Sequence, residues 1–181
     1  MKKKVELKVL NVSNSQAQAC AYAMILGEVN GKRQLPIIIG STEAQAIVLK
    51  LKGIESPRPL SHDFIETCLN EFSINVSEVL IYKAQEGIFY SYVYLKKEDK
   101  TIEIDSRTSD AVALAIRFKC PIYIYESILE KEAMAVDEES KEEEDMEEEN
   151  LQSLKESLAK AIKEENYELA SIIRDKISHL Q

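Results

Sequence analysis

The sequence IDSRTSDAVALAIRFKCP, residues 104–121, decides the fold of this chain, because a predicted strand ends and a predicted helix begins within it. A short β-favouring run, residues 101–104, leads into it, and apolar residues at positions 111, 114, 115 and 118 follow at helical spacing. Five polar side chains lie at the junction: Asp105, Ser106, Arg107, Ser109 and Asp110. Unpaired backbone N–H groups at a helix start favour such residues, so the junction is either a functional site or a helix cap made by Asp105 or Ser106.

The rest of the first 134 residues predicts hairpins and helices in an irregular order. Strands are expected at residues 4–12, 20–29, 33–39, 73–84, 88–96, 101–104 and 121–125. Helices are expected after Gly40, after Ser61 as N-cap, and at residues 126–134. Because regular βαβ alternation is missing, we predict an α+β domain over residues 1–134, in which a mixed or antiparallel sheet of hairpins packs with helices.

Two turn signals mark the predicted hairpins. Asn30-Gly31 is a tight-turn dipeptide between the second and third expected strands. Gln85-Glu86-Gly87 joins two runs that are rich in Val, Ile and Tyr. Both pairs of strands are therefore expected to be antiparallel neighbours.

The net charge of −9 is confined to one segment. Residues 137–149 contain ten acids and one lysine, whereas residues 1–136 contain 17 basic and 17 acidic side chains. An acidic run of this kind cannot bury apolar surface and repels itself, so we expect residues 135–150 to be an extended linker. The neutral body does not by itself exclude nucleic-acid binding.

The last segment, residues 151–181, predicts an αα-hairpin. Apolar residues at positions 151, 154, 158, 161 and 162 form one helical stripe, and a second stripe follows Asn166. A hairpin of about 30 residues is too small to be stable alone. We therefore expect it to pack against a second copy or a protein partner, and we expect a homo-oligomer.

The composition indicates the cellular compartment of the protein and the metal ions that its side chains would suit. No apolar run approaches the roughly 20 residues of a membrane span, and the first residues lead into a strand rather than a signal peptide, so we expect a cytoplasmic protein without a membrane segment. Cys20, Cys68 and Cys120 are odd in number and lack CxxC spacing, which favours core cysteines. With two histidines in the chain, a metal site would depend on carboxylates and suit Mg²⁺ or Mn²⁺.

Three motifs resemble the bifunctional nuclease family. They are LPIIIGSTEAQAI at residues 35–47, RPLSHD at residues 58–63, with Ser61 where the family has Thr, and DSRTSDAVALAIR at residues 105–117, with Thr108 where proline is usual. The resemblance spans nearly all of residues 4–130. It implies an α+β fold and, from plant members, hydrolysis of both RNA and DNA.

The tail resembles the UVR motif. The sequence YELASIIRDKI, residues 167–177, is similar to the Phe-Glu-x-Ala-Ala-x-Leu-Arg-Asp-x-Ile core of that helical hairpin. In the UVR family the hairpin binds proteins. The resemblance therefore implies a protein partner for residues 151–181.

Phosphodiester hydrolysis needs charge neutralisation at phosphorus and an activated water, and it often uses metal ions held by carboxylates. The candidate catalytic residues are Asp105, Arg107, Asp110, His62, Asp63 and Arg58. Arg107 could clamp a phosphate and His62-Asp63 could transfer a proton. Glu43 joins this group if the fold brings the segments together.

Each candidate also has a structural interpretation. Asp110 could pair with Arg107 or Arg58, His62 could neighbour a helix cap, and Glu43 could be a favourable first-turn acid. Four tyrosines lie on predicted strands, Tyr82, Tyr90, Tyr92 and Tyr94, and the last three share one face, which suits sheet packing or base stacking. Two functions remain open: a metal-dependent, sequence-nonspecific nuclease, and a non-catalytic oligomeric module that binds a protein or small ligand.

Overall fold

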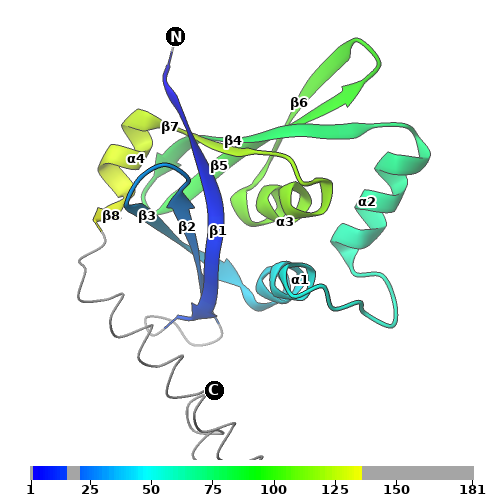
Figure 1. The fold of residues 1–181 in the computed structure, drawn as a ribbon, viewed down its shortest axis with the longest axis horizontal. Coiled ribbons are helices and arrows are strands. Elements are labelled where there is room, and N and C mark those ends of the chain that lie inside the picture. The colour runs from blue at the N-terminus through cyan, green and yellow to red at the C-terminus, as the bar shows by residue number, and fades with distance from the viewer. Residues whose placement is uncertain (1, 16–20, 136–181) are drawn as a thin grey trace, which may run out of the picture. The chain divides into compact units, whose positions relative to one another are not determined.

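A computed structural model describes residues 2–15 and 21–135 of the chain, which form one mixed sheet and four helices (Figure 1). The strands are β1 (Lys4–Asn14), β2 (Ala21–Glu28), β3 (Arg33–Gly40), β4 (Asn75–Gln85), β5 (Ile88–Lys97), β6 (Lys100–Arg107), β7 (Ile122–Tyr125) and β8 (Met134–Ala135). The helices are α1 (Ser41–Leu51), α2 (Ser61–Glu71), α3 (Thr108–Phe118) and α4 (Glu126–Glu132). The predicted α+β fold is confirmed.

The strand order in the sheet is β6-β5-β4-β7-β1-β2-β3-β8. Consecutive hairpins pair antiparallel, whereas β4 and β7 pair parallel at the centre, so the sheet is mixed. Both predicted hairpins are present, and Glu86 and Gly87 turn the second one with positive φ values of 53° and 76°. Positive φ at both central residues is typical of a tight hairpin turn, which explains the glycine there.

One continuous core joins the helices to one face of the sheet. Leu26 on β2 pairs with Leu35 on β3, and both are fully buried. α3 contributes a run of buried apolar residues, Ala111 to Ala115, in which every second residue is alanine, and this lets the helix approach the sheet and α1 closely. Figure 1 shows α1, α2 and α3 grouped on one side, with α4 at the other end of the sheet.

Two expected helix caps were wrong. Asp105 and Ser106 belong to β6, because that strand pairs with β5 as far as Arg107 opposite Tyr90. Arg107 keeps an extended backbone and is the N-cap of α3. Likewise Ser61 is the first residue of α2 and Leu60 is its N-cap.

Contacts divide the chain into two units, Met1–Ala135 and Val136–Gln181. The expected acidic linker and helical hairpin lie outside the described residues, as does Cys20. No helix among the described residues is long and apolar enough to span a membrane.

Candidate functional site

Three helix starts meet around one cavity of about 310 Å³. Its polar lining includes Glu43 from the first turn of α1, His62 from α2, and Asp110 from α3, together with Arg107. Each helix start provides unpaired N–H groups and a partial positive charge, which favour acidic side chains there. The structure therefore brings together residues that are far apart in the sequence.

Arg107 bridges the two carboxylates of the cavity. Its Nε donates to Asp110 Oδ2 at 2.7 Å, and its Nη2 donates to Glu43 Oε1 at 2.6 Å and to Asp110 Oδ1 at 3.2 Å. The hydrogen bonds to Asp110 and then to Glu43 raise the pKa of Arg107 above its usual value, so it stays protonated. The pairing of Asp110 with Arg107 that the sequence suggested is confirmed.

Gly40 allows the Glu43 carboxylate to fold back over the start of α1. A Cβ atom at position 40 would lie 2.5 Å from Glu43 Oε2. Gly40 ends β3 and is the N-cap of α1. The glycine of the strand-to-helix motif thus leaves room for the side chain that contacts Arg107.

His62 is buried and has one ring nitrogen anchored. Its Nε2 lies 2.9 Å from Asp110 Oδ1, and its side chain is only 8% exposed. Because an ionised carboxylate only accepts hydrogen bonds, this contact assigns the proton to Nε2 in the neutral ring. The other nitrogen, Nδ1, is buried and has no hydrogen-bond partner in the described part of the chain.

The start of α3 is anchored from beneath by a buried hydroxyl pair. Thr108 Oγ1 lies 2.7 Å from Ser91 Oγ on β5, and both residues are almost fully buried. Buried hydroxyls need such partners because an unsatisfied one is costly. This pair fixes the helix turn from which Asp110 points toward His62.

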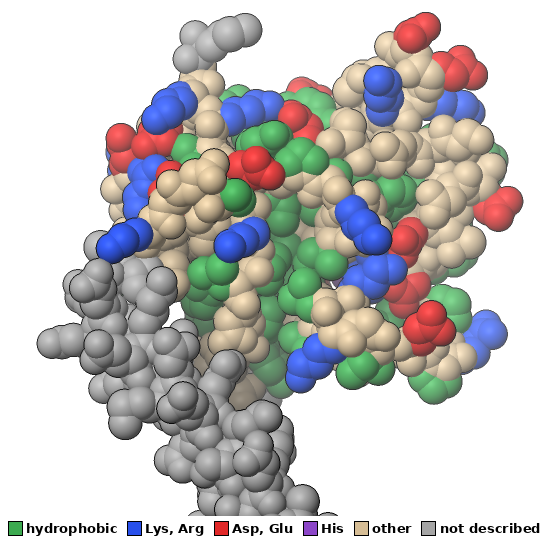
Figure 2. All heavy atoms as spheres, viewed as in Figure 1, with side chains coloured by type: hydrophobic (Ala, Val, Ile, Leu, Met, Phe, Trp, Pro, Cys, Tyr) green, Lys and Arg blue, Asp and Glu red, His purple; other side chains and the backbone are tan. Residues whose placement is uncertain are grey.

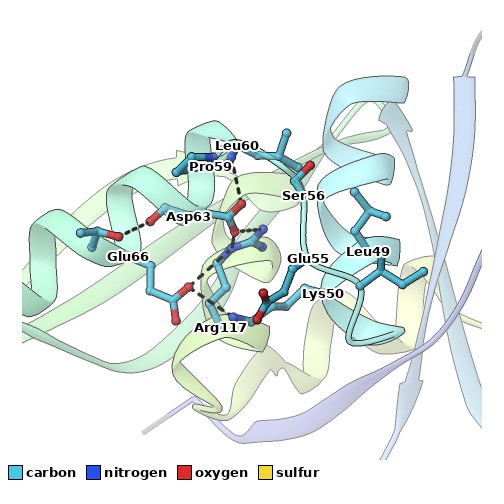
Figure 3. Close-up of a pocket in the computed structure, with 11 residues that line it drawn as sticks. Leu49, Lys50, Glu55, Ser56, Pro59, Leu60, Asp63, Glu66 and Arg117 are labelled. Carbon is cyan, nitrogen blue, oxygen red and sulfur yellow. Dashed lines mark hydrogen bonds and ion pairs between the residues drawn. The ribbon is translucent and has the colours of Figure 1, made fainter.

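Three predicted site residues lie outside this cavity. Asp63 points toward Arg117 at a second cavity of about 290 Å³, between α1 and α2 (Figure 3). Asp105 is exposed on β6 and accepts a hydrogen bond from the Tyr82 hydroxyl at 3.0 Å. Arg58 is exposed, and within residues 2–15 and 21–135 it makes no hydrogen bond or ion pair. The structure therefore groups Arg107, Asp110 and His62 with Glu43, and separates the other three.

Arg117 is a polar residue for which the sequence analysis assigned no role. It is 5% exposed, although it is a charged residue in the last turn of α3. Its Nε donates to Asp63 Oδ1 at 2.8 Å. The signal that could have found it is its spacing of seven residues from Asp110, which places both residues on one helix face.

The carboxylates of the 310 Å³ cavity are paired with Arg107 and are not grouped as a set of metal ligands. Among residues 2–15 and 21–135, no group of three or more His, Cys, Asp or Glu side chains could hold one. The carboxylates of Glu43 and Asp110 are instead held together by Arg107.

The described cysteines, Cys68 and Cys120, are free, and burial raises the pKa of the Cys120 thiol to about 11.

The tyrosines pack on one another as well as on the sheet. Tyr82 stacks on Tyr92 with ring centroids 3.9 Å apart and planes 9° apart, and the Lys83 ammonium lies 4.7 Å from the centre of the Tyr90 ring. Figure 2 shows lysine and arginine side chains scattered among acidic ones on one face of the molecule. These contacts agree with sheet packing, and this face carries no concentrated basic patch.

Comparison with known proteins gives consistent matches. A family model of the bifunctional nuclease domain matches residues 24–137, and a model of the UvrB/uvrC motif matches residues 148–181. An uncharacterized protein of Mycobacterium tuberculosis is 39% identical over 138 residues, which cover 76% of this chain and 82% of that protein. Bifunctional nuclease 1 of Oryza sativa subsp. japonica is 31% identical over 107 residues, covering 57% of this chain and 32% of the rice protein. Bifunctional nuclease 1 of Arabidopsis thaliana is 23% identical over 110 residues, covering 59% and 34%.

Proposed function

Because this chain belongs to the family of bifunctional nuclease domain proteins, we propose that it is a sequence-nonspecific nuclease that hydrolyses phosphodiester bonds in RNA and DNA. The proposed site is the cavity between the starts of α1, α2 and α3. The candidate catalytic residues are His62 and Arg107, and Asp110 orients both of them.

The observation that carries this proposal is the state of the His62 ring. One nitrogen is held by a carboxylate, while the other is buried without a partner among the described residues. An imidazole that is oriented on one side and unpaired on the other is suited to act as a general base or acid. In this arrangement Nδ1 carries the lone pair, so Nδ1 is the atom that takes the proton.

The proposed reaction uses the cavity residues alone. Because Nδ1 of His62 is buried, the wall of the cavity has to open before water reaches it. Nδ1 then accepts the proton of a water molecule as the water oxygen forms a bond to phosphorus. The bond from phosphorus to the leaving oxygen breaks, and that oxygen receives the proton from the imidazolium. Asp110 stabilises the imidazolium through its contact with Nε2.

Arg107 is placed to neutralise the phosphoryl oxygens. It uses Nε and Nη2 for Asp110 and Glu43, which leaves both Nη1 protons without a hydrogen bond among the described residues. Its side chain is 68% exposed, so a ligand can reach it. A guanidinium held by two carboxylates has a fixed orientation, which favours recognition of a phosphate.

We further propose that residues 151–181 form a separate protein-binding hairpin, joined to the body by the acidic segment. The match of residues 148–181 to the UvrB/uvrC motif and the apolar stripes of these residues support this. Deleting residues 136–181 should leave the body folded and abolish binding of a protein partner. If the truncated body unfolds at a much lower temperature than the full chain, the body and residues 151–181 are not separate units, and this proposal is wrong.

A non-catalytic interaction module is the second candidate. The charge balance favours it, because residues 1–136 carry 17 basic and 17 acidic side chains and nonspecific nucleic-acid affinity comes largely from phosphate neutralisation. The body would then bind a protein or small ligand as an oligomer.

The deciding experiment is cleavage of labelled single-stranded RNA and DNA by highly purified full-length protein. The reaction is run with Mg²⁺, with Mn²⁺ and with EDTA, beside His62→Gln, Arg107→Ala and Asp110→Asn variants whose folding is verified. Asp105→Asn is the matched control, because Asp105 lies on the same strand-to-helix segment but contacts Tyr82.

Activity that disappears in the first three variants and persists in Asp105→Asn supports the nuclease and its site. Activity in all four variants indicates another site or a contaminant. Absence of cleavage in every condition favours the interaction module. Activity that survives EDTA agrees with the donor set of the cavity, whereas activity abolished by EDTA shows that a metal takes part.

A further inference from the structure

Arg117 is a buried charge that connects the three helices of the proposed site. Its side chain is 1% exposed. It donates from Nη1 to the Ala113 carbonyl at 2.9 Å on its own helix, from Nη2 to the Ala46 carbonyl at 3.3 Å on α1, and from Nε to Asp63 Oδ1 at 2.8 Å on α2. Figure 3 shows its guanidinium pointing toward Asp63, with Glu66 and Lys50 beside the pair.

Asp63 transmits this anchoring to the first turn of α2. Its Oδ1 faces Arg117, and its Oδ2 accepts the backbone N–H of the N-cap residue Leu60 at 2.9 Å. Burial alone would raise the pKa of Asp63, but the hydrogen bonds from Leu60 and Arg117 outweigh it and hold the pKa below its usual value. The carboxylate is therefore charged at neutral pH, with both oxygens in use.

Two adjacent residues of α2 are held by two residues of α3 that share one face. Asp110 contacts His62, and Arg117 contacts Asp63. Because Asp110 and Arg117 are seven residues apart, they lie about two turns and about 10 Å apart along the axis. Because α3 contacts the start of α2 at two points, the start of α2 has little freedom to rotate.

We infer that Arg117 is a positioning residue, which acts through Asp63 to keep the His62 ring directed at Asp110. The effect of Arg117 on catalysis rests on the proposed function, but its effect on the orientation of the His62 ring can be tested without measuring cleavage. The relevant property is whether His62 keeps its Nε2 proton in the hydrogen bond to Asp110.

The test is ¹⁵N NMR of the imidazole rings in the full chain. The chain has two histidines, His62 and His179, so a His179→Gln variant assigns the spectrum. The wild-type protein should show a single Nε2–H tautomer for His62, with a slowly exchanging proton. Arg117→Lys keeps the charge but removes the planar fork, and it should give mixed tautomers and fast exchange.

Arg33→Lys is the matched control. Arg33 also uses a guanidinium fork, on Glu28 and Glu126, but it lies on β3 outside the cavity. It should leave the His62 spectrum unchanged. An equal change in Arg33→Lys would show general loosening and overturn the inference.

Activity provides the second measurement. If the protein hydrolyses nucleic acid, Arg117→Lys should lower kcat on the order of a hundredfold through misplacement of His62, with KM nearly unchanged because Arg107 is intact. A wild-type His62 spectrum in folded Arg117→Lys overturns the inference, whatever the activity. Loss of the single Nε2–H tautomer of His62 in Arg117→Lys supports the positioning role of Arg117 even if neither the wild type nor any variant cleaves nucleic acid. In that case only the proposed nuclease function is refuted. If Arg117→Lys does not fold, Asp63→Asn takes its place, because it removes the charge and keeps the side-chain shape. A changed His62 spectrum in Asp63→Asn then supports the inference, and an unchanged spectrum overturns it.

Discussion

Replacement of Asp63 by alanine removes the carboxylate that faces a charge buried to 1% exposure. Loss of one partner of a buried ion pair costs about 3–5 kcal/mol, because the remaining charge stays buried without compensation. Around Arg117 the carbonyls of Ala113 and Ala46 remain, and Glu66 Oε2 lies 3.9 Å from its Nε. These groups offset part of the loss, so we expect the free energy of unfolding to fall by about 3 kcal/mol.

Urea denaturation followed by circular dichroism at pH 7 measures this change. The midpoint should fall while the slope m stays unchanged, since the same surface is exposed on unfolding. Glu28→Ala is the control, because its partner Arg33 is 29% exposed and keeps Glu126. We expect the control to cost about 1 kcal/mol or less. A stability of Asp63→Ala within about 0.5 kcal/mol of the wild type would refute the argument, since surface substitutions give changes of that size.

The pH dependence of the same variant has a defined sign. The pKa of Asp63 is lower in the folded chain than its usual value of about 3.9. A carboxyl group of this kind contributes stability above the unfolded pKa and loses it as the pH falls through the folded pKa. The difference in free energy of unfolding between wild type and Asp63→Ala should therefore be constant near neutral pH and narrow only below about pH 4.

Three further changes have expected outcomes. If the protein is a nuclease, His62→Gln should lower kcat by about 10²–10⁴-fold at pH 7, and cleavage kinetics would show it; an unchanged kcat would exclude His62 as the general base. Ser91→Ala should cost about 1–3 kcal/mol in urea denaturation because it leaves the buried Thr108 hydroxyl unpaired, whereas the double variant Ser91→Ala/Thr108→Val should cost less than the sum of the single changes. Burial and the hydrogen bond to Asp105 raise the pKa of Tyr82, so ultraviolet titration of Tyr82→Phe should show one late-ionising tyrosine fewer than the wild type; the same number of late-ionising tyrosines in both would contradict this.

The elements that the sequence predicted well are those with strong local signals. The helix after the polar junction, both hairpins and the α+β class are confirmed, because apolar periodicity and turn residues determine them locally. Both family resemblances are confirmed by the matches over residues 24–137 and 148–181.

The parts that were missed depend on pairing between distant segments. β6 continues to Arg107 only because β5 pairs with it that far, and nothing in the local sequence marks this end. The parallel contact of β4 with β7 and the two-residue strand β8 are likewise set by tertiary packing. For this reason the expected helix cap, Asp105 or Ser106, was placed one or two residues before the observed N-cap Arg107.

The candidate site was predictable in its residue types but not in its grouping. Arg107 and Asp110 are close in sequence, whereas Glu43 and His62 reach them only because three helix starts converge. Asp63 directly follows His62, yet the 3.6-residue period of the helix turns it toward Arg117 and away from the cavity. Neighbours in sequence therefore took different roles.

The unpartnered nitrogen of His62 favours the proposed nuclease over the interaction module. A structural cap would need only the contact between Nε2 and Asp110. A buried polar atom without a partner costs about 1–3 kcal/mol, so a purely structural role gives no reason to retain Nδ1 in that state. Arg107, which is 68% exposed, keeps its Nη1 protons for a phosphate while its Nε and Nη2 hold the two carboxylates. An oriented base beside an accessible guanidinium is what hydrolysis of a phosphodiester requires, and for this reason we place the nuclease ahead of the interaction module.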